Sequence, residues 1–330
     1  MIIAFIDSLR ANGSAVESIC RVLSDQGCKI AARTYRAWRV RKPAARTVAD
    51  AHVIDAVREV VWNTGADGRR KMTPEGLYGR VKMRAHLDRT AIPGVSYGAV
   101  DRAMKLLRHN GIRRAKGIRT TIRSADGVRA GDLLNRQFRA EEPNRVWVTD
   151  FTYVRTWAGW VYVVFIIDVF SRRIVAWHAS MSKTVDLVTI PLRMALWQRR
   201  REGNPVKAAE LIHHSDAGSQ YTSVKLTEKL ALENIAASIG SVGDAYDNAL
   251  VESANGLYKT ECIRTTIFHS GSYKTITDVE FATAGWVEWY NVKRLHSSIG
   301  HMPPVEYETL HYADLTTEDQ PQLEAAQNLG

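Results

Sequence analysis

The sequence predicts an α/β protein in which helices flank a mixed five-stranded sheet and a helical region precedes that sheet. Three observations support this prediction. Five runs of β-branched and aromatic residues are interleaved with segments that have the periodicity of helices. Acidic residues stand in or just after two of these runs, and a third lies in a predicted helix. Residues 1–145 are basic, whereas the remaining residues carry a net negative charge.

The predicted strands are marked by their composition and by the turns between them. Residues 146–154 are aromatic and β-branched, and the turn Ala158-Gly159 follows them. Residues 160–169 and 173–179 complete an antiparallel meander. The remaining elements are short strands at 211–214 and 237–239 and helices at 184–200, 223–233, 248–259 and 278–290, the last with Val279, Ala282, Trp286 and Trp289 on one apolar face.

Three carboxylates occupy distinct local contexts: Asp150 in the first strand, Asp216 after the fourth strand, and Glu252 in a helix. Each also has an ordinary explanation, as a paired buried aspartate, a turn former and a surface glutamate. However, a charged side chain in a buried strand requires a partner or a metal ion. Hard divalent cations prefer oxygen ligands, and two of them held together promote displacement at a phosphodiester. We therefore expect Asp150, Asp216 and Glu252 to be both metal ligands and catalytic residues.

Four motifs occur around these carboxylates and after them, spread over roughly residues 70–310. They are Trp147 to Tyr153, His214 to Tyr221, Tyr246 to Ser253, and Tyr290 to His296 followed by Gly300 and Pro303-Pro304. In this order they closely resemble the second-frame product of insertion sequence 3 family transposases. The resemblance implies a ribonuclease H-like catalytic core of the retroviral integrase superfamily, with an Asp-Asp-Glu triad.

The same resemblance implies a DNA transposase that cleaves insertion-sequence ends and joins them to DNA by two-metal-ion phosphoryl transfer. Its cofactors would be two Mg²⁺ ions, with Mn²⁺ able to substitute. Its partners would be double-stranded DNA, as terminal inverted repeats and target, further copies of the chain in at least a dimer, and the upstream-frame product as a fusion. Two alternatives stay open: a non-catalytic DNA-binding regulator or partner of a frameshifted fusion transposase, and a ribonuclease H-like nuclease acting on RNA–DNA hybrids.

Charge is distributed unevenly along the 330 residues, whose formal net charge is +10. Residues 1–145 carry 29 Lys or Arg against 14 Asp or Glu, whereas residues 146–330 carry 16 against 21. A basic region of this kind suits a polyanion such as DNA, although a solvated basic face is the simpler alternative. Three cysteines without a metal-binding spacing and the lack of a long apolar run predict a cytoplasmic protein without a membrane span. The resemblance implies in addition that the protein is bacterial and nucleoid-associated.

Two helical pairs precede the sheet. The first, with its turn at Gln26-Gly27, only weakly resembles a helix-turn-helix. In the second pair, residues 74–87 and 96–107, Ser96 can cap the second helix and Asn110-Gly111 ends it. We expect this second helix to contact DNA through Arg102, Lys105 and Arg108, the alternative being that these side chains are merely exposed.

Further DNA contacts are expected from residues around the triad. Lys259 follows Glu252 by seven positions, which in related integrases is a residue near the reacting DNA end, and Asn248 lies one turn before Glu252. Arg294 and His296 are expected to contact DNA or to brace the core. His213 and His214 lack zinc-ligand spacing and are assigned to support or packing, and Asp168 to a turn.

The predicted domain organisation has six parts. They are a weak helix-turn-helix-like segment at 1–45, a helical DNA-binding domain at 46–112, a basic linker at 113–143, the catalytic core at 144–265, a C-terminal helical extension at 266–312 and a disordered acidic tail at 313–330.

Overall fold

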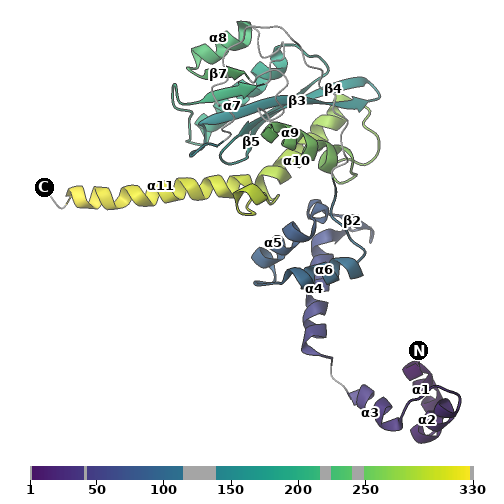
Figure 1. Cartoon of the computed structure of the whole chain (residues 1–330). Helices are drawn as coiled ribbons and strands as arrows, with labels where there is room; N and C mark the ends of the chain where they lie inside the picture. The colour runs from purple at the N-terminus through teal and green to yellow at the C-terminus, as the bar shows by residue number, and fades with distance from the viewer. Residues whose placement is uncertain (1, 41–42, 114–138, 216–223, 240–248, 328–330) are drawn as a thin grey trace. The chain divides into compact units, whose positions relative to one another are not determined.

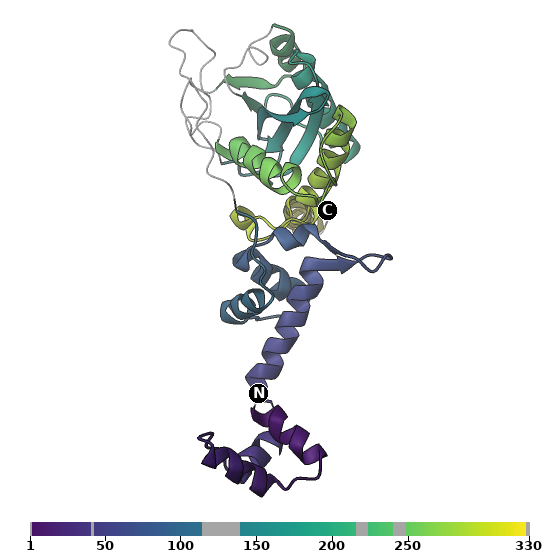
Figure 2. The same cartoon turned by 90° about the vertical axis from the view of Figure 1, so that its right-hand side faces the viewer.

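The computed structural model describes residues 2–40, 43–113, 139–215, 224–239 and 249–327 and is shown in two views in Figures 1 and 2. The contacts within the chain divide it into two compact units, residues 1–53 and residues 54–330. Each unit is described by itself. Within the described residues, no helix is both long enough and apolar enough to cross a membrane.

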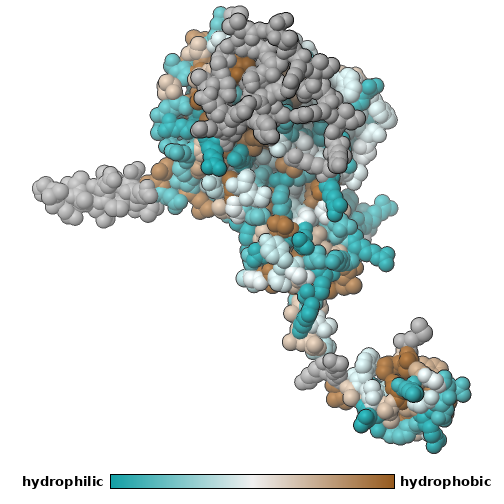
Figure 3. Space-filling model, in the orientation of Figure 1, coloured by the Kyte–Doolittle hydropathy of each residue, from teal (hydrophilic) through white to brown (hydrophobic). Residues whose placement is uncertain are grey.

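The first unit is a small helical bundle. Its helices are α1 (Ile2–Ala11), α2 (Val16–Asp25) and α3 (Ala32–Val40), so the structure adds α1 to the expected helical pair. Gly27 has φ of +86°, a conformation that favours glycine, and it forms the turn after α2. Ile6, Cys20 and Tyr35 meet in a core of few residues. Hydrophobic side chains therefore remain at its surface, where brown and teal areas mix in Figure 3.

The second unit begins with a helical region and a small hairpin. Its elements are α4 (Ala45–Val61), which starts in the first unit, β1 (Trp62–Thr64), β2 (Arg70–Met72), η1 (Pro74–Leu77), α5 (Arg80–Thr90) and α6 (Tyr97–Leu106). The Ser96 hydroxyl accepts a hydrogen bond from the Ala99 N–H at 3.2 Å, the N-cap that the sequence predicted. The β1–β2 hairpin was not predicted from the sequence.

The sheet has five strands in the order β5-β4-β3-β6-β7, with β3 at its centre (Figure 1). The strands are β3 (Val146–Thr156), β4 (Gly159–Asp168), β5 (Ile174–Ser180), β6 (Ile212–Ser215) and β7 (Ala236–Ile239). β3, β4 and β5 form the predicted antiparallel meander, whereas β6 and β7 run parallel to β3. The prediction of a mixed five-stranded sheet is confirmed.

Among the described residues, β6 pairs with the first part of β3 only. β6 pairs with β3 over four residues only, and the last pair is Ser215 with Thr149. β3 continues to Thr156. Asp150 is therefore the first residue of β3 beyond this parallel pairing, and Asp216 follows Ser215 in the sequence.

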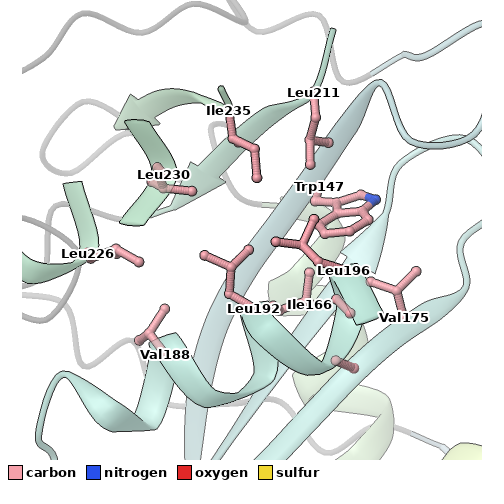
Figure 4. Close-up of a cluster of buried hydrophobic side chains, with 12 residues drawn as sticks. Trp147, Ile166, Val175, Val188, Leu192, Leu196, Leu211, Leu226, Leu230 and Ile235 are labelled. Carbon is pink, nitrogen blue, oxygen red and sulfur yellow. The ribbon is translucent and has the colours of Figure 1, made fainter. Parts of the chain in front are cut away.

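Helices cover both faces of the sheet. On one face, α7 (Asp186–Arg201) and α8 (Val224–Leu232) pack over Trp147, Ile166 and Val175 in the hydrophobic cluster of Figure 4. Neighbouring residues of a strand point to opposite faces. Phe165, next to Ile166, accordingly packs on the other face, with ring centroids 5.1 Å from Tyr258 and 5.8 Å from Trp286.

The second face carries the C-terminal half of the unit, including α9, which is green in Figure 2. The elements on this face are α9 (Ala249–Leu257), the π-helix η2 (Tyr258–Ile263) and α10 (Ile276–Val292). They are followed by η3 (Ser297–Ile299) and by α11 (Pro304–Gln327), which extends away from the sheet in Figure 1. The prediction of a disordered tail from residue 313 differs from the structure, in which α11 continues to Gln327. The start of α11 is anchored where Glu308, which is buried, pairs with Arg199.

The helical region of the second unit is joined to these C-terminal elements by polar contacts, some buried and one exposed. The Leu295 N–H donates to the Tyr78 hydroxyl at 3.1 Å, and Trp289 Nε1 donates to Glu75 Oε1 at 2.9 Å. Arg89 Nη2 donates to both carboxylate oxygens of Glu306 at 2.7 Å. Tyr78 is 2% exposed, so this junction excludes water at its centre.

Candidate active site

Asp150 lies on the sheet face covered by α9. It is paired in register with Phe165, whose ring packs against Tyr258 on that face. Its Oδ1 accepts the Phe151 N–H at 2.7 Å, and its Oδ2 accepts Nδ2 of Asn255 at 2.8 Å. The side chain is half-buried, so its charge is stabilised by these neutral donors while solvent still reaches it.

The hydrogen bond from Asn255 places α9 directly against β3 at Asp150. Asn255 itself is 8% exposed. Glu252 precedes it by three positions and is therefore on a neighbouring part of the helix surface, where its side chain is exposed. One helix thus brings an acidic side chain and a neutral donor to the region of Asp150.

Two of the predicted site residues, Asp216 and Asn248, lie outside the described residues. The last described residue of β6 is Ser215, which directly precedes Asp216 in the sequence. Ser215 pairs with Thr149, which directly precedes Asp150. Within the part of the chain that the structure describes, no cluster of three acidic, histidine or cysteine side chains has metal-binding geometry. Of the three predicted carboxylates, the structure describes Asp150 and Glu252, and the helix that carries Glu252 contacts Asp150 through Asn255.

Lys259 emerges from a π-helical turn, whereas the sequence predicted a continuous α-helix to this residue. α9 ends at Leu257, and η2 starts at Tyr258, whose ring is buried against Phe165 and Trp286 and whose hydroxyl lies 2.7 Å from Thr283 Oγ1. Single π turns inside helices often occur at functional sites. The expected alignment of Asn248, Glu252 and Lys259 on one α-helical face is therefore replaced by a wider turn before Lys259.

The ammonium group of Lys259 faces an aromatic ring beside the carboxylate region. Its Nζ lies 4.5 Å from the centre of the Tyr153 ring, a cation–π distance. Burial and the charge of Arg264 lower the pKa of Lys259, while Asp150 acts in the opposite direction. Tyr153 in turn packs edge-on against Trp160, and both rings are nearly half exposed. A cation and two exposed rings therefore adjoin the candidate site.

The two histidines of β6 form buried hydrogen bonds with the neighbouring strands. His213 Nε2 lies 2.9 Å from Thr149 Oγ1, and His214 Nδ1 lies 2.9 Å from Ser238 Oγ. Both rings are buried, and burial lowers the pKa of His213 to about 4. His213 is thus a neutral hydrogen-bonding group at neutral pH, in agreement with the supporting role expected from the sequence.

The basic residues expected to contact DNA in the helical region are exposed. Arg102 and Lys105 lie on α6 and Arg108 lies just after it, with φ of +51°. Lys105 Nζ is 2.9 Å from Asp101 Oδ2, and such exposed ion pairs contribute little to stability. The structure thus leaves these cations in a position where they could contact a polyanion.

Arg294 and His296 are in the interior, which favours the bracing role over DNA contact. Arg294 is 3% exposed and donates to both oxygens of Glu261, from Nη2 at 2.7 Å and from Nε at 2.9 Å. His296 Nε2 lies 3.2 Å from the Tyr290 carbonyl, and burial lowers its pKa well below its ordinary value. The expectation that these two residues bind DNA does not fit these contacts, because their hydrogen-bonding groups already have internal partners.

Two residues of the site were missed by sequence reasoning. Asn255 could have been found from its spacing of three positions after Glu252 in the helix. Tyr153 was read only as a strand residue, and its contact with Lys259 depends on the turn η2. Both lie against groups that the sequence did identify.

Known proteins resemble this chain over most of its length. The family description Integrase core domain matches residues 140–245, and a second description with the same wording matches residues 233–304. A protein of Mycobacterium tuberculosis described as a transposase for insertion sequence element IS986/IS6110 is 40% identical over 284 residues, 86% of this chain and 96% of that protein. The transposase for insertion sequence element IS629 of Shigella sonnei is 46% identical over 243 residues, 74% of this chain and 77% of that protein.

More distant matches also concern insertion sequences and integrases. The transposase InsF for insertion sequence IS3A of Escherichia coli is 35% identical over 182 residues, 55% of this chain and 60% of that protein. The solved structure of the HTLV-2 integrase catalytic core domain in complex with magnesium has a TM-score of 0.36 and 16% identity, covering 52% of this chain and 99% of that one. This last likeness is too low to carry an argument.

Proposed function

This chain belongs to the insertion sequence 3 family of DNA transposases, and we propose that Asp150, Asp216 and Glu252 form the acidic triad with which it cleaves and joins DNA. One observation supports the proposal more than any other. The 2.8 Å hydrogen bond between Asn255 and Asp150 holds the helix of Glu252 against β3, beside the point where β6 ends before Asp216. A strand, a strand end and a helix thereby converge.

The donors fit two Mg²⁺ ions, with Mn²⁺ able to substitute, because all three side chains offer carboxylate oxygens. Asp150 is half-buried, and its two oxygens accept hydrogen bonds from the Phe151 N–H and from Asn255. When bound, a pair of divalent cations supplies activation of the attacking oxygen and stabilisation of the leaving oxygen. Asn255 would orient Asp150 for this purpose, as hydrogen-bond partners of metal ligands commonly do.

The reaction consists of two phosphoryl transfers. In the first, water attacks a phosphodiester at the element end, and the products are a 3′-hydroxyl and a 5′-phosphate. In the second, that 3′-hydroxyl attacks another phosphodiester. A bond from its oxygen to phosphorus forms as the bond from phosphorus to the leaving oxygen breaks. No protein nucleophile is required. Lys259, held over Tyr153 next to Asp150, would position the phosphate backbone near the reacting end.

Recognition of the element ends is assigned to the helical region before the sheet. Arg102, Lys105 and Arg108 would contact the terminal inverted repeats, with α6 in the major groove. Joining two ends to each other or to target DNA requires at least two active sites, so the active complex is proposed to contain at least two copies of the chain. A fusion with the product of the upstream reading frame would add its own DNA-binding part.

The test is strand cleavage and strand transfer on a labelled duplex that carries the element's own end. We expect product with Mg²⁺, and we expect Asp150→Asn, Asp216→Asn and Glu252→Gln each to lower the cleavage rate by about 10³-fold or more. Binding of the same duplex in EDTA should stay unchanged. Glu228→Gln, which alters an exposed glutamate of α8, is the matched control for Glu252→Gln and should cleave normally.

The outcomes separate the alternatives. Cleavage that survives one of the three substitutions would remove that residue from the site. Binding without any product from the wild-type chain would favour a non-catalytic regulator or a missing upstream partner. Cleavage of an RNA–DNA hybrid in preference to the duplex would favour a ribonuclease H-like nuclease.

A further inference from the structure

A pocket of about 550 Å³ lies beside α9 in the second unit. Its wall is made by α5, α9, α10, η3 and the turn between β4 and β5. The lining side chains are mostly polar or basic: Lys82, Arg172, Leu250, Ser253, Ala254, Leu257, Tyr290, Arg294, His296, Ser297 and Ser298. No carboxylate of the described residues lines this pocket.

Arg172 is the unusual member of this lining. It has φ of +64°, a left-handed conformation that is uncommon for residues other than glycine, asparagine and aspartate. Its Nε is buried without a hydrogen-bond partner, and no contact within the described residues gives its guanidinium an ion pair. The Nε of the adjacent Arg173 is also buried without a partner, but the Nη groups of Arg173 pair with Glu202 and Glu308. Buried donors normally have a partner, so the lack of one at Arg172 requires an explanation.

The charges around Arg172 leave the pocket positive. Arg294 is neutralised by the buried Glu261, and His296 is neutral because burial lowers its pKa well below the ordinary value. Lys82 and Arg172 are the other cations of the lining. Burial lowers the pKa of Arg172, while Tyr290 and Asp168 act in the opposite direction.

The pocket and the triad lie on opposite sides of α9. Leu250, Ala254 and Leu257 recur at i, i+4 and i+7 and line the pocket. Asn255, which donates to Asp150, is about 100° from Ala254 around a helix of 3.6 residues per turn. A helix with its side chains is about 10 to 12 Å across, a length that corresponds to about three base pairs of duplex DNA at 3.4 Å per step.

We propose that this pocket binds a backbone phosphate of the DNA substrate, with Arg172 as its main donor and Lys82, Ser297 and Ser298 around the anion. The chemistry of the pocket matches a phosphate, since a guanidinium and hydroxyl groups donate to its oxygens and no carboxylate opposes it. The inference rests on the proposed function for its ligand. It adds a second anchoring point for the strand, separated from the reacting phosphate by the width of α9.

The experiment measures binding of the full chain to the labelled element-end duplex in EDTA as a function of salt. Arg172→Gln is expected to weaken binding by about tenfold and to reduce the slope of log affinity against log salt by about 0.9, the loss of one phosphate contact. Arg193→Gln removes an equal charge from the exposed face of α7 and should change neither quantity. Arg172→Lys should restore part of the affinity.

Ethylation interference on the same duplex identifies the phosphate. A position whose ethylation weakens binding of the wild-type chain should become neutral in Arg172→Gln, while the other positions stay unchanged. An unaltered salt slope and footprint in Arg172→Gln, with a lower melting temperature, would overturn the proposal and leave Arg172 a structural residue. These measurements need no cleavage, so a failure of the proposed catalytic function would appear separately, as normal binding without product.

Discussion

On one side of α9, Asn255 donates to Asp150 and Glu252 is exposed, whereas on the other side Ala254 and Leu257 line a pocket whose charged members are all cations. The two sides are also supported differently. On the acidic side, the hydrogen bonds to Asp150 come from neutral groups, the Phe151 N–H and Asn255. The basic side is built on a buried ion pair between Arg294 and Glu261.

Under the two proposals, one short helix would serve two ligands of opposite charge. Neutral hydrogen-bond donors orient the Asp150 carboxylate without adding a charge of their own. On the other side, Glu261 cancels the charge of Arg294 internally, so that the positive potential of the pocket comes from Arg172 and Lys82. Separate substitutions should therefore affect metal-dependent chemistry and salt-dependent binding independently.

The largest effect is expected from breaking the ion pair behind the pocket. Glu261→Gln leaves the Arg294 charge buried without its partner, which should lower the free energy of unfolding by about 3 to 5 kcal/mol. Urea unfolding of the purified chain measures this loss. The double variant Glu261→Gln with Arg294→Met removes both charges and should recover part of the stability. A loss below about 1 kcal/mol would show instead that water screens the pair, as at exposed sites.

The buried hydrogen bond between His213 of β6 and Thr149 of β3 should appear in the pH dependence of stability. The pKa of His213 is lowered to about 4 in the folded chain from an ordinary value of 6.5, so the unfolded chain takes up the proton first as the pH falls. The contribution of His213 is thus fully present above pH 6.5 and is lost toward pH 4. The expected decrease is on the order of 2 to 3 kcal/mol.

Unfolding of His213→Gln at several pH values isolates this contribution. Other groups that titrate in the same range remain in the variant, so the difference between the two curves reports His213. We expect the curves to converge as the pH falls toward 4. A constant difference from pH 7 to pH 4 would show that His213 does not titrate across this range.

The smallest effect is expected from loosening the contact between α9 and β3. Asn255→Leu removes the donor to Asp150 and should lower cleavage by about tenfold and raise the Mg²⁺ concentration required, with binding to the duplex in EDTA unchanged. Asn255→Asp places a carboxylate beside Asp150 and should reduce cleavage further. Equal effects of both variants on binding in EDTA would indicate a displaced helix in place of a disoriented carboxylate.

The sequence alone predicted the sheet because its strands are local features. Residues 146–154 and 160–169 have the composition of buried strands and a glycine turn between them, and β3 and β4 form there. Asp150 was identifiable because a carboxylate interrupts such a run. The order of the sheet and its parallel part agree with the fold that the motifs implied.

Features that depend on distant contacts could not be predicted in this way. The π turn at Tyr258 is fixed by the rings of Phe165 and Trp286, which are far away in the sequence. Arg294 looks like a free cation in the sequence, and only its pairing with Glu261 shows that it is internal. Likewise, the polar composition after residue 313 suggested disorder, whereas α11 continues from a start anchored by Glu308.

The junction at Tyr78 has a consequence for the time course of synthesis. The partner of its hydroxyl, the Leu295 N–H, is 217 residues later in the chain. At about 5 to 20 residues per second, a ribosome needs roughly 10 to 40 s to make that stretch. During this interval Tyr78 keeps its local contacts with Lys82 and His86, but Tyr78 and Glu75 lack the partners that Leu295 and Trp289 supply, and a chain that ends before Trp289 never acquires them. Nascent and truncated chains therefore expose a surface that the finished protein buries.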